Sequence, residues 1–143
     1  MIKRSCLLGL AAALVVPIVA DAAVRTVMME EFTNVQCPPC ASVAPTLDAF
    51  ITDHPDDLAV VYYHMYWPGY DPWWADNQAD NGARRTYYAI SGVPTCVMNG
   101  FKMSTISRAA LDHFFNQAMD EPCYMSMGLS GHWNVGAGTG TVT

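Results

Sequence analysis

Two cysteines separated by two residues, Cys37 and Cys40, are the residues of this chain best suited to do chemistry. They lie where a predicted strand gives way to a predicted helix, and one helical turn brings their sulfurs close enough to form a disulfide. The N-terminus of the helix favours a thiolate on the first cysteine through its dipole and its free N–H groups. That thiolate attacks a substrate disulfide, and the second cysteine resolves the mixed disulfide. The spacing therefore predicts a redox pair.

The same spacing also occurs at the start of many zinc sites, and it fits a structural disulfide that only stabilises the start of the helix. Zinc needs a second ligand pair, but Cys96 and Cys123 are isolated in the sequence. The histidines also lack ligand spacing: His54, His64, His113 and His132. A structural disulfide and a Cu(I) site on the two thiolates stay open as alternatives. We expect no metal and no cofactor, because the dithiol itself carries the two electrons.

The sequence around the pair predicts the elements that position it. Patterns of apolar residues predict a mostly buried strand over 24–33, a helix over 38–52 and a second buried strand over 58–64. A strand, a helix and a strand in one unit of this length imply a right-handed parallel crossover. The cysteine pair then lies at the carboxyl end of the first strand.

A loop rich in proline, glycine and aromatic residues follows at 65–76. Trp67 and its aromatic neighbours lie near the carboxyl end of the second strand, where α/β sheets place their sites. They form either a hydrophobic platform that binds substrate or a lid that packs on the core. A helix over 78–90 comes next, with these residues expected to face inward: Ala79, Ala83, Tyr87 and Ile90.

The remaining elements form a hairpin and a last helix. A strand over 95–98 leads into Asn99-Gly100, a strong hairpin signal, and a strand over 101–103 returns antiparallel. Ser104 or Thr105 then caps a helix that ends near residue 119. The predicted order is β-α-β-α-β-β-α. Cys96 is either a small buried residue of its strand or the partner of Cys123 in a disulfide.

The stretch from residue 31 to residue 45 resembles the active-site segment of the thioredoxin superfamily. That family has an acidic residue six positions before the first cysteine and a helix-kinking proline five positions after the second. Glu31, Cys37, Cys40 and Pro45 match this pattern in register. Downstream, residues 91–95 resemble the cis-proline loop of the family. The resemblance implies an α/β thioredoxin-like fold, with a central mixed sheet flanked by helices.

A finer likeness lies in the string from His64 to Pro72 together with residues 84–88, which resembles exported thioredoxin-like proteins of bacterial envelopes. Some of these proteins have a β-rich C-terminal extension. The composition of this chain also changes after Pro122, where glycines become frequent. We therefore expect a thioredoxin-like domain over 23–121 and, over 122–143, either the start of an incomplete β-rich module or a flexible end.

The resemblance assigns a physical role to each matched residue. Cys37 is expected to be the exposed nucleophile and Cys40 the buried resolving thiol. Glu31, on the strand beneath the helix, is expected to accept or relay the Cys40 proton, with a pKa raised by burial. Its neighbour Glu30 is the alternative inward-facing carboxylate.

The resemblance also gives the downstream proline loop a role. Pro94, if cis, places the Val93 backbone against the Cys37 sulfur, where it can pair with a substrate chain as an added strand. The alternative is an ordinary trans proline that opens a strand.

The two residues between the cysteines depart from the commonest family pattern. Pro38 and Pro39 remove two N–H groups that would otherwise point at the Cys37 sulfur. The nearest eight residues on either side of Cys37 also include no Lys, Arg or His. We therefore expect a pKa for Cys37 that is only modestly depressed, and a pair that acts as a reductant or a mild oxidant.

The first 22 residues have the features of an export signal. Lys3 and Arg4 precede an apolar run, and Ala20-Asp21-Ala22 offers a signal peptidase site, which predicts cleavage after Ala22. The alternative, an uncleaved anchor, has a run shorter than the ~20 apolar residues of a membrane span. Cleavage leaves four cysteines, an even number, in a compartment where disulfides persist, the periplasm or the extracellular space. No later segment is expected to span a membrane.

Charge excludes one class of partner. Cleavage would leave five basic and twelve acidic residues, a net charge of −7, and no basic stripe. Nucleic acid is therefore not an expected partner. The expected partners are protein dithiols or disulfides and an electron partner that the sequence does not identify. The rival interpretation is a non-catalytic binding module of a surface assembly, in which the disulfide is structural.

Overall fold

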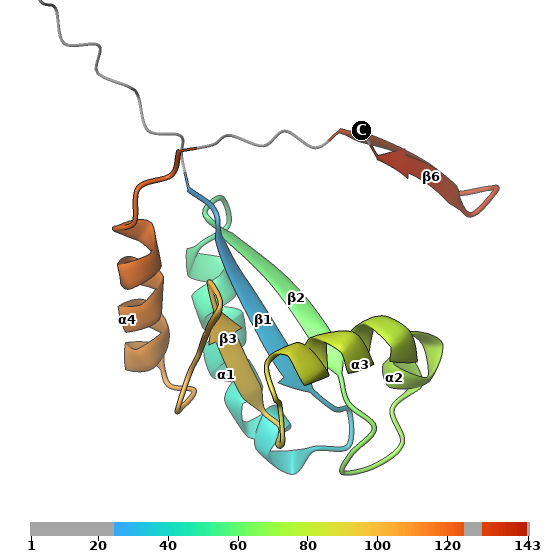
Figure 1. Ribbon diagram of the computed structural model, residues 1–143, viewed down its shortest axis with the longest axis horizontal. Helices are drawn as coiled ribbons and strands as arrows, with labels where there is room; N and C mark the ends of the chain where they lie inside the picture. Colours follow the sequence, from blue (N-terminus) through green and yellow to red (C-terminus); the bar gives the residue numbers. More distant parts are fainter. Residues whose placement is uncertain (1–24, 125–129, 143) are drawn as a thin grey trace, which may run out of the picture.

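A computed structural model describes residues 25–124 and 130–142 of the chain. Its main sheet has four strands in the order β2-β1-β3-β4. Their bounds are β1 (Val27–Thr33), β2 (Leu58–His64), β3 (Thr95–Met98) and β4 (Phe101–Lys102). β1 runs parallel to β2 and antiparallel to β3 (Figure 1). β3 is antiparallel to β4. The sheet is therefore mixed, as predicted.

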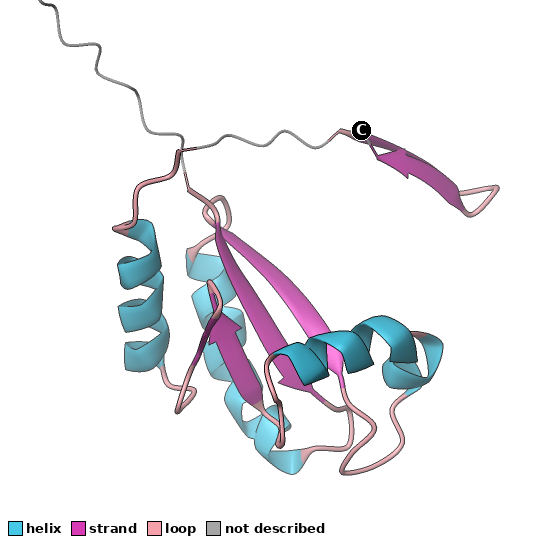
Figure 2. Cartoon of the chain, in the orientation of Figure 1, coloured by secondary structure: helices cyan, strands magenta, loops and turns pink. Residues whose placement is uncertain are grey.

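Helices cover both faces of this sheet (Figure 2). α1 (Pro38–Asp53) and α4 (Arg108–Met119) pack on one face, where Leu47 and Phe50 meet Leu111 and Phe115 in the larger apolar cluster. The smaller cluster, around Phe32, lies on the opposite face beside α2 (Pro72–Asp76) and α3 (Gln78–Tyr87). The predicted α/β fold and its order are confirmed, with α2 as an added helix.

α2 forms inside the segment predicted to be a loop. The Asp71 side chain caps it by accepting the backbone N–H groups of Trp73 and Trp74, and Pro72 occupies the first helical position. The sequence did not predict this short helix, because proline and aromatic residues are frequent in the segment. An Asp-Pro pair is also typical of loops as well as of capped first turns. The last helix also begins later than predicted, at Arg108, with Ser107 as its cap.

The inward face of α3 is polar, which makes the prediction for this helix wrong at three positions. Ala79, Ala83 and Tyr87 are exposed, and Tyr87 is 73% exposed. Asn81 is the buried residue of α3, and Arg84 reaches Glu30 on β1. Apolar periodicity could not predict this arrangement, because α3 contacts the sheet through hydrogen bonds to distant polar partners.

The C-terminal residues form a separate small element. β5 (Gly131–Asn134) and β6 (Thr139–Val142) pair as an antiparallel hairpin. This agrees with the β-rich character expected for the tail, whereas the domain boundaries at residues 22 and 122 stay predictions. The export signal over 1–22 lies outside the described residues. Among the helices of the described residues, none has the length and apolarity to cross a membrane.

Candidate redox site

Cys37 and Cys40 form a disulfide at the start of α1, with their Cα atoms 5.2 Å apart. Cys37 is the N-cap residue, and its sulfur lies 3.1 Å from the backbone nitrogen of Cys40, which donates to it. Pro38 and Pro39 occupy the next two positions and have no N–H group to add. The sulfur of Cys37 is therefore stabilised by one backbone donor and the helix dipole.

This single donor predicts the acidity of the reduced thiol. We expect Cys37 alkylation, measured against pH on the reduced chain, to have a midpoint above about 6. The Cys37→Ser variant gives the background rate from the other thiols. A midpoint well below 6 would contradict the expectation and make the pair a strong oxidant.

The loop before β3 lies against the Cys37 sulfur. The Val93–Pro94 peptide bond is cis, and the Val93 carbonyl oxygen is 3.7 Å from the sulfur of Cys37. Cys37 is only 4% exposed, so the expectation of an exposed nucleophile is wrong for the disulfide form. A cavity of about 310 Å³ lined by both cysteines provides the approach from solvent.

Glu31 shares this cavity with the two cysteines. It lies on the face of β1 that α1 covers, and it is 4% exposed. The pKa of Glu31 is raised to about 7, because burial raises it strongly and the nearby Asp48 charge adds to the rise, while a hydrogen bond with Thr33 partly opposes it. The carboxyl group can therefore exchange a proton near neutral pH, as relay of the Cys40 proton requires.

Glu30 is buried too, but on the opposite face of β1. Its carboxylate accepts hydrogen bonds from Arg84 and from the Tyr88 hydroxyl, the latter at 2.7 Å. Burial alone would raise the pKa of Glu30, but the Arg84 and Tyr88 hydrogen bonds outweigh it and lower the pKa. The two adjacent glutamates thus have opposite environments, and only Glu31 lines the cavity of the cysteine pair.

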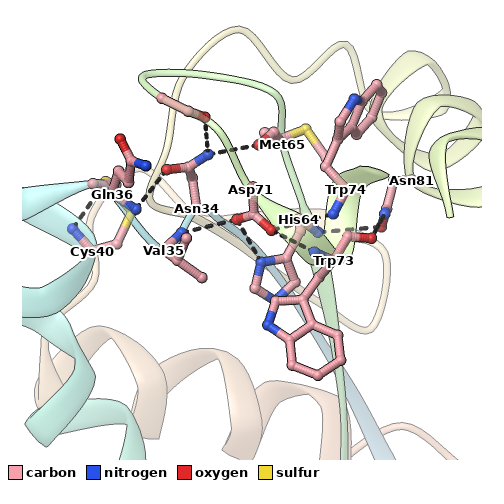
Figure 3. A network of polar contacts seen from close by, with 12 residues as sticks. Asn34, Val35, Gln36, Cys40, His64, Met65, Asp71, Trp73, Trp74 and Asn81 are labelled. Carbon is pink, nitrogen blue, oxygen red and sulfur yellow. Dashed lines mark hydrogen bonds and ion pairs between the residues drawn. A yellow bond between two sulfur atoms is a disulfide. The ribbon is translucent and has the colours of Figure 1, made fainter. Parts of the chain in front are cut away.

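A polar network that the sequence did not reveal holds the segment before Cys37 (Figure 3). The Asn34 side chain donates to the carbonyls of Met65 and Gly69, and it accepts the Gln36 N–H. Asp71 accepts the Val35 N–H at 2.9 Å. These contacts fix the entry to α1 against the loop that follows β2.

The same network brings a histidine to the cavity. His64 ends β2, lines the cavity beside Cys37, and its Nδ1 lies 2.8 Å from the Asp71 carboxylate. Asp71 is buried, and its bonds with His64, Val35 and Trp74 lower its pKa against the effect of burial. The sequence contained His64 and Asp71 in the string that resembles exported thioredoxin-like proteins, but it did not predict that the two side chains bond to each other beside Cys37.

Two other predicted residues lie away from this cavity. Trp67 is partly buried against the smaller apolar cluster, with the Arg85 guanidinium 5.1 Å from its ring, and its role in substrate binding stays a prediction. Cys96 is a fully buried free thiol in the larger cluster, opposite Glu31 in the β1–β3 register. Burial raises the pKa of the Cys96 thiol to about 12, so it is inert near neutral pH.

No family model and no curated protein matches this chain. It is similar to solved structures of a thioredoxin from Wuchereria bancrofti (19% identity, 64% of this chain and 75% of that chain, TM-score 0.47) and a thioredoxin from Fasciola hepatica (15%, 65% and 81%, 0.46). It is also similar to tryparedoxin I from Leishmania major (19%, 64% and 75%, 0.46).

Proposed function

We propose that this chain, whose fold is thioredoxin-like, is an exported thiol–disulfide oxidoreductase that acts on envelope or extracellular proteins through Cys37 and Cys40. The observation that carries the proposal is the disulfide at the start of α1, beside a cavity that also contains a buried acid. A disulfide that only stapled the helix would not need a proton-exchanging carboxyl next to it. Export is supported by the sequence of residues 1–22.

The reduced chain would reduce a substrate disulfide in two steps. The Cys37 thiolate attacks one substrate sulfur, so that a mixed disulfide forms and the other substrate sulfur leaves as a thiolate. Glu31 then takes the Cys40 proton, and the Cys40 thiolate attacks the Cys37 sulfur. The two substrate thiolates take up the proton held by Glu31 and one proton from water, so the substrate leaves as a dithiol and the chain keeps the Cys37–Cys40 disulfide. A dithiol electron partner then reduces that disulfide again.

The direction of electron flow follows from the acidity of Cys37. A strongly stabilised thiolate would make the reduced form favourable and the disulfide a strong oxidant. Here one N–H group faces the sulfur, the Arg84 guanidinium is paired with Glu30, and the His64 imidazole is bonded to Asp71. We therefore infer a reductant or a mild oxidant.

Turnover of insulin disulfides with dithiothreitol as electron donor tests the proposal. We expect the wild-type chain to accelerate insulin reduction, and the Cys37→Ser variant to reduce the rate to that of dithiothreitol alone. Cys96→Ala is the matched control, because Cys96 is buried and does not line the cavity, and it should retain activity. No acceleration by the wild-type chain would favour the binding module with a structural disulfide.

A further inference from the structure

The outer edge of β2 is the largest unpaired backbone edge in the described part of the main sheet. The sheet order gives β2 one neighbour, β1, along all seven residues of the strand. The strand consists largely of β-branched and aromatic residues, which favour extended pairing. Such an edge presents N–H and C=O groups that can receive another strand. At its carboxyl end the His64 N–H is already bonded to the Asn81 side chain, so strand addition would use the part of the edge before His64.

A cavity of about 590 Å³ lies directly at this edge. Three consecutive residues of β2, Val61 to Tyr63, line it together with α3. Successive side chains of a strand point to opposite faces, so a cavity that contacts three in a row must adjoin the strand edge. The cavity is thus a groove between the edge of β2 and α3.

This groove continues to the redox pair. Tyr62 lines the edge groove, the cavity of the cysteine pair and a third cavity of about 440 Å³ between them. His64 and the exposed Trp73 also line the third cavity. A chain in extended conformation along β2 would therefore lead toward Cys37.

The walls of the three cavities are acidic and aromatic. Asp48, Asp76 and Asp80 are exposed on them, whereas the Arg84 guanidinium is engaged by Glu30. Exposed aromatic rings also line the walls: Tyr62, Trp73 and Tyr87. Carboxylates beside aromatic rings complement lysine and arginine side chains, through ion pairs and cation–π contacts.

We propose that the edge of β2 binds an extended, lysine- or arginine-containing segment of the protein substrate by strand addition, and that this segment guides the substrate disulfide to Cys37. The inference rests on the proposed function for its last step, but the binding step is independent of it. Main-chain hydrogen bonds to β2 would supply affinity, and the acidic, aromatic walls would supply the preference for basic segments.

Binding is tested without chemistry, on the oxidised chain, with a cysteine-free peptide that alternates lysine and valine. We expect it to bind and to protect the outward-facing amides of β2 from hydrogen exchange. A peptide of equal length with glutamate in place of lysine should bind at least about fivefold more weakly, because the charge contacts are reversed. Insulin turnover is measured separately, so loss of turnover with intact binding would contradict the oxidoreductase and not the groove.

Charge-reversal variants test where on the chain the lysine peptide binds. Asp80→Lys and Asp48→Lys should each weaken the lysine peptide about fivefold. Two such variants are used because Asp80 also accepts a hydrogen bond from Asn77 and its replacement can disturb α3. Asp120→Lys, at the end of α4, is the matched control and should not change binding. The proposal would be overturned if the two peptides bound equally well or if β2 were not protected. It would also be overturned if protection depended only on the concentration of the chain, because that result indicates self-association.

Discussion

Replacement of Glu31 by glutamine is expected to stabilise the fold by about 3 kcal/mol at pH 8. Burial raises the pKa of Glu31 from 4.5 to about 7, so the folded chain must hold an ionised, poorly solvated carboxylate above pH 7. Glutamine has nearly the same shape and carries no charge. The variant should therefore remove the cost of burying this charge while keeping the packing.

The sign of the pH dependence follows from the same shift. Below pH 4.5 the carboxyl is protonated in both the folded and the unfolded chain, so the variant should have no advantage there. Between pH 4.5 and 7 the folded chain holds its proton while the unfolded chain loses it, so wild-type stability falls as the pH rises. Above pH 7 the difference should stay constant.

Glu30 provides the matched control, because it is the adjacent residue with the opposite environment. Glu30→Gln removes the charge that pairs with Arg84 and accepts the Tyr88 hydroxyl, and it should destabilise the fold by about 3 kcal/mol at pH 8. Urea unfolding of the oxidised chain at pH 4 and pH 8 measures both variants. Destabilisation by Glu31→Gln at pH 8, or an equal effect at both pH values, would contradict the account.

The stability that Glu31→Gln adds should come with a cost in turnover. Without a proton acceptor beside Cys40, the resolving thiol is deprotonated by solvent alone, so the second step should slow and the mixed disulfide should accumulate. An ionisable group that lowers stability above neutral pH is then retained for its chemistry. Such trade-offs between stability and activity are common at functional sites.

The second large effect is expected at Asp71. Replacement by asparagine should lower the free energy of unfolding by about 3 kcal/mol at pH 7. The buried Asp71 carboxylate accepts from His64 and from the N–H groups of Val35, Trp73 and Trp74. An amide places an NH₂ group toward some of these donors and leaves them unpaired.

Asp76→Asn is the matched control for Asp71→Asn. Asp76 is exposed at the end of the same short helix, and its replacement should change stability by less than about 0.5 kcal/mol. The stabilisation from Asp71 is present above its ordinary pKa of 3.8 and is lost as the pH falls through its lowered value in the folded chain. Urea unfolding of the two variants at pH 7 makes the comparison, and equal midpoints would refute a structural role for this carboxylate.

The parts of the fold that the sequence predicted are those with local signals. The parallel crossover follows from apolar periodicity, the hairpin from Asn99-Gly100, and the redox pair from the spacing of Cys37 and Cys40. Each of these signals lies within a few residues of the structure that it specifies.

The features that sequence patterns missed depend on partners far apart in the chain. Glu30 and Arg84 are 54 positions apart, and Val35 and Asp71 are 36 apart. Apolar periodicity predicts that α3 contacts the sheet through apolar residues. It cannot predict that a glutamate of β1 pairs with an arginine of α3. The burial of Cys37 has the same origin, because the Val93 backbone reaches it from 56 positions away.

Trapping of a mixed disulfide tests the central claim most directly. A reduced Cys40→Ser chain, incubated with a disulfide-linked peptide, should form a stable adduct with half of the peptide on Cys37, located by mass spectrometry after digestion. The Cys37→Ser chain should form no adduct on Cys40 or Cys96, since the helix N-terminal donor that stabilises a thiolate faces the Cys37 sulfur and Cys96 is fully buried. No adduct on Cys37, or an adduct on Cys96 in its place, would contradict the assignment of Cys37 as the attacking thiol.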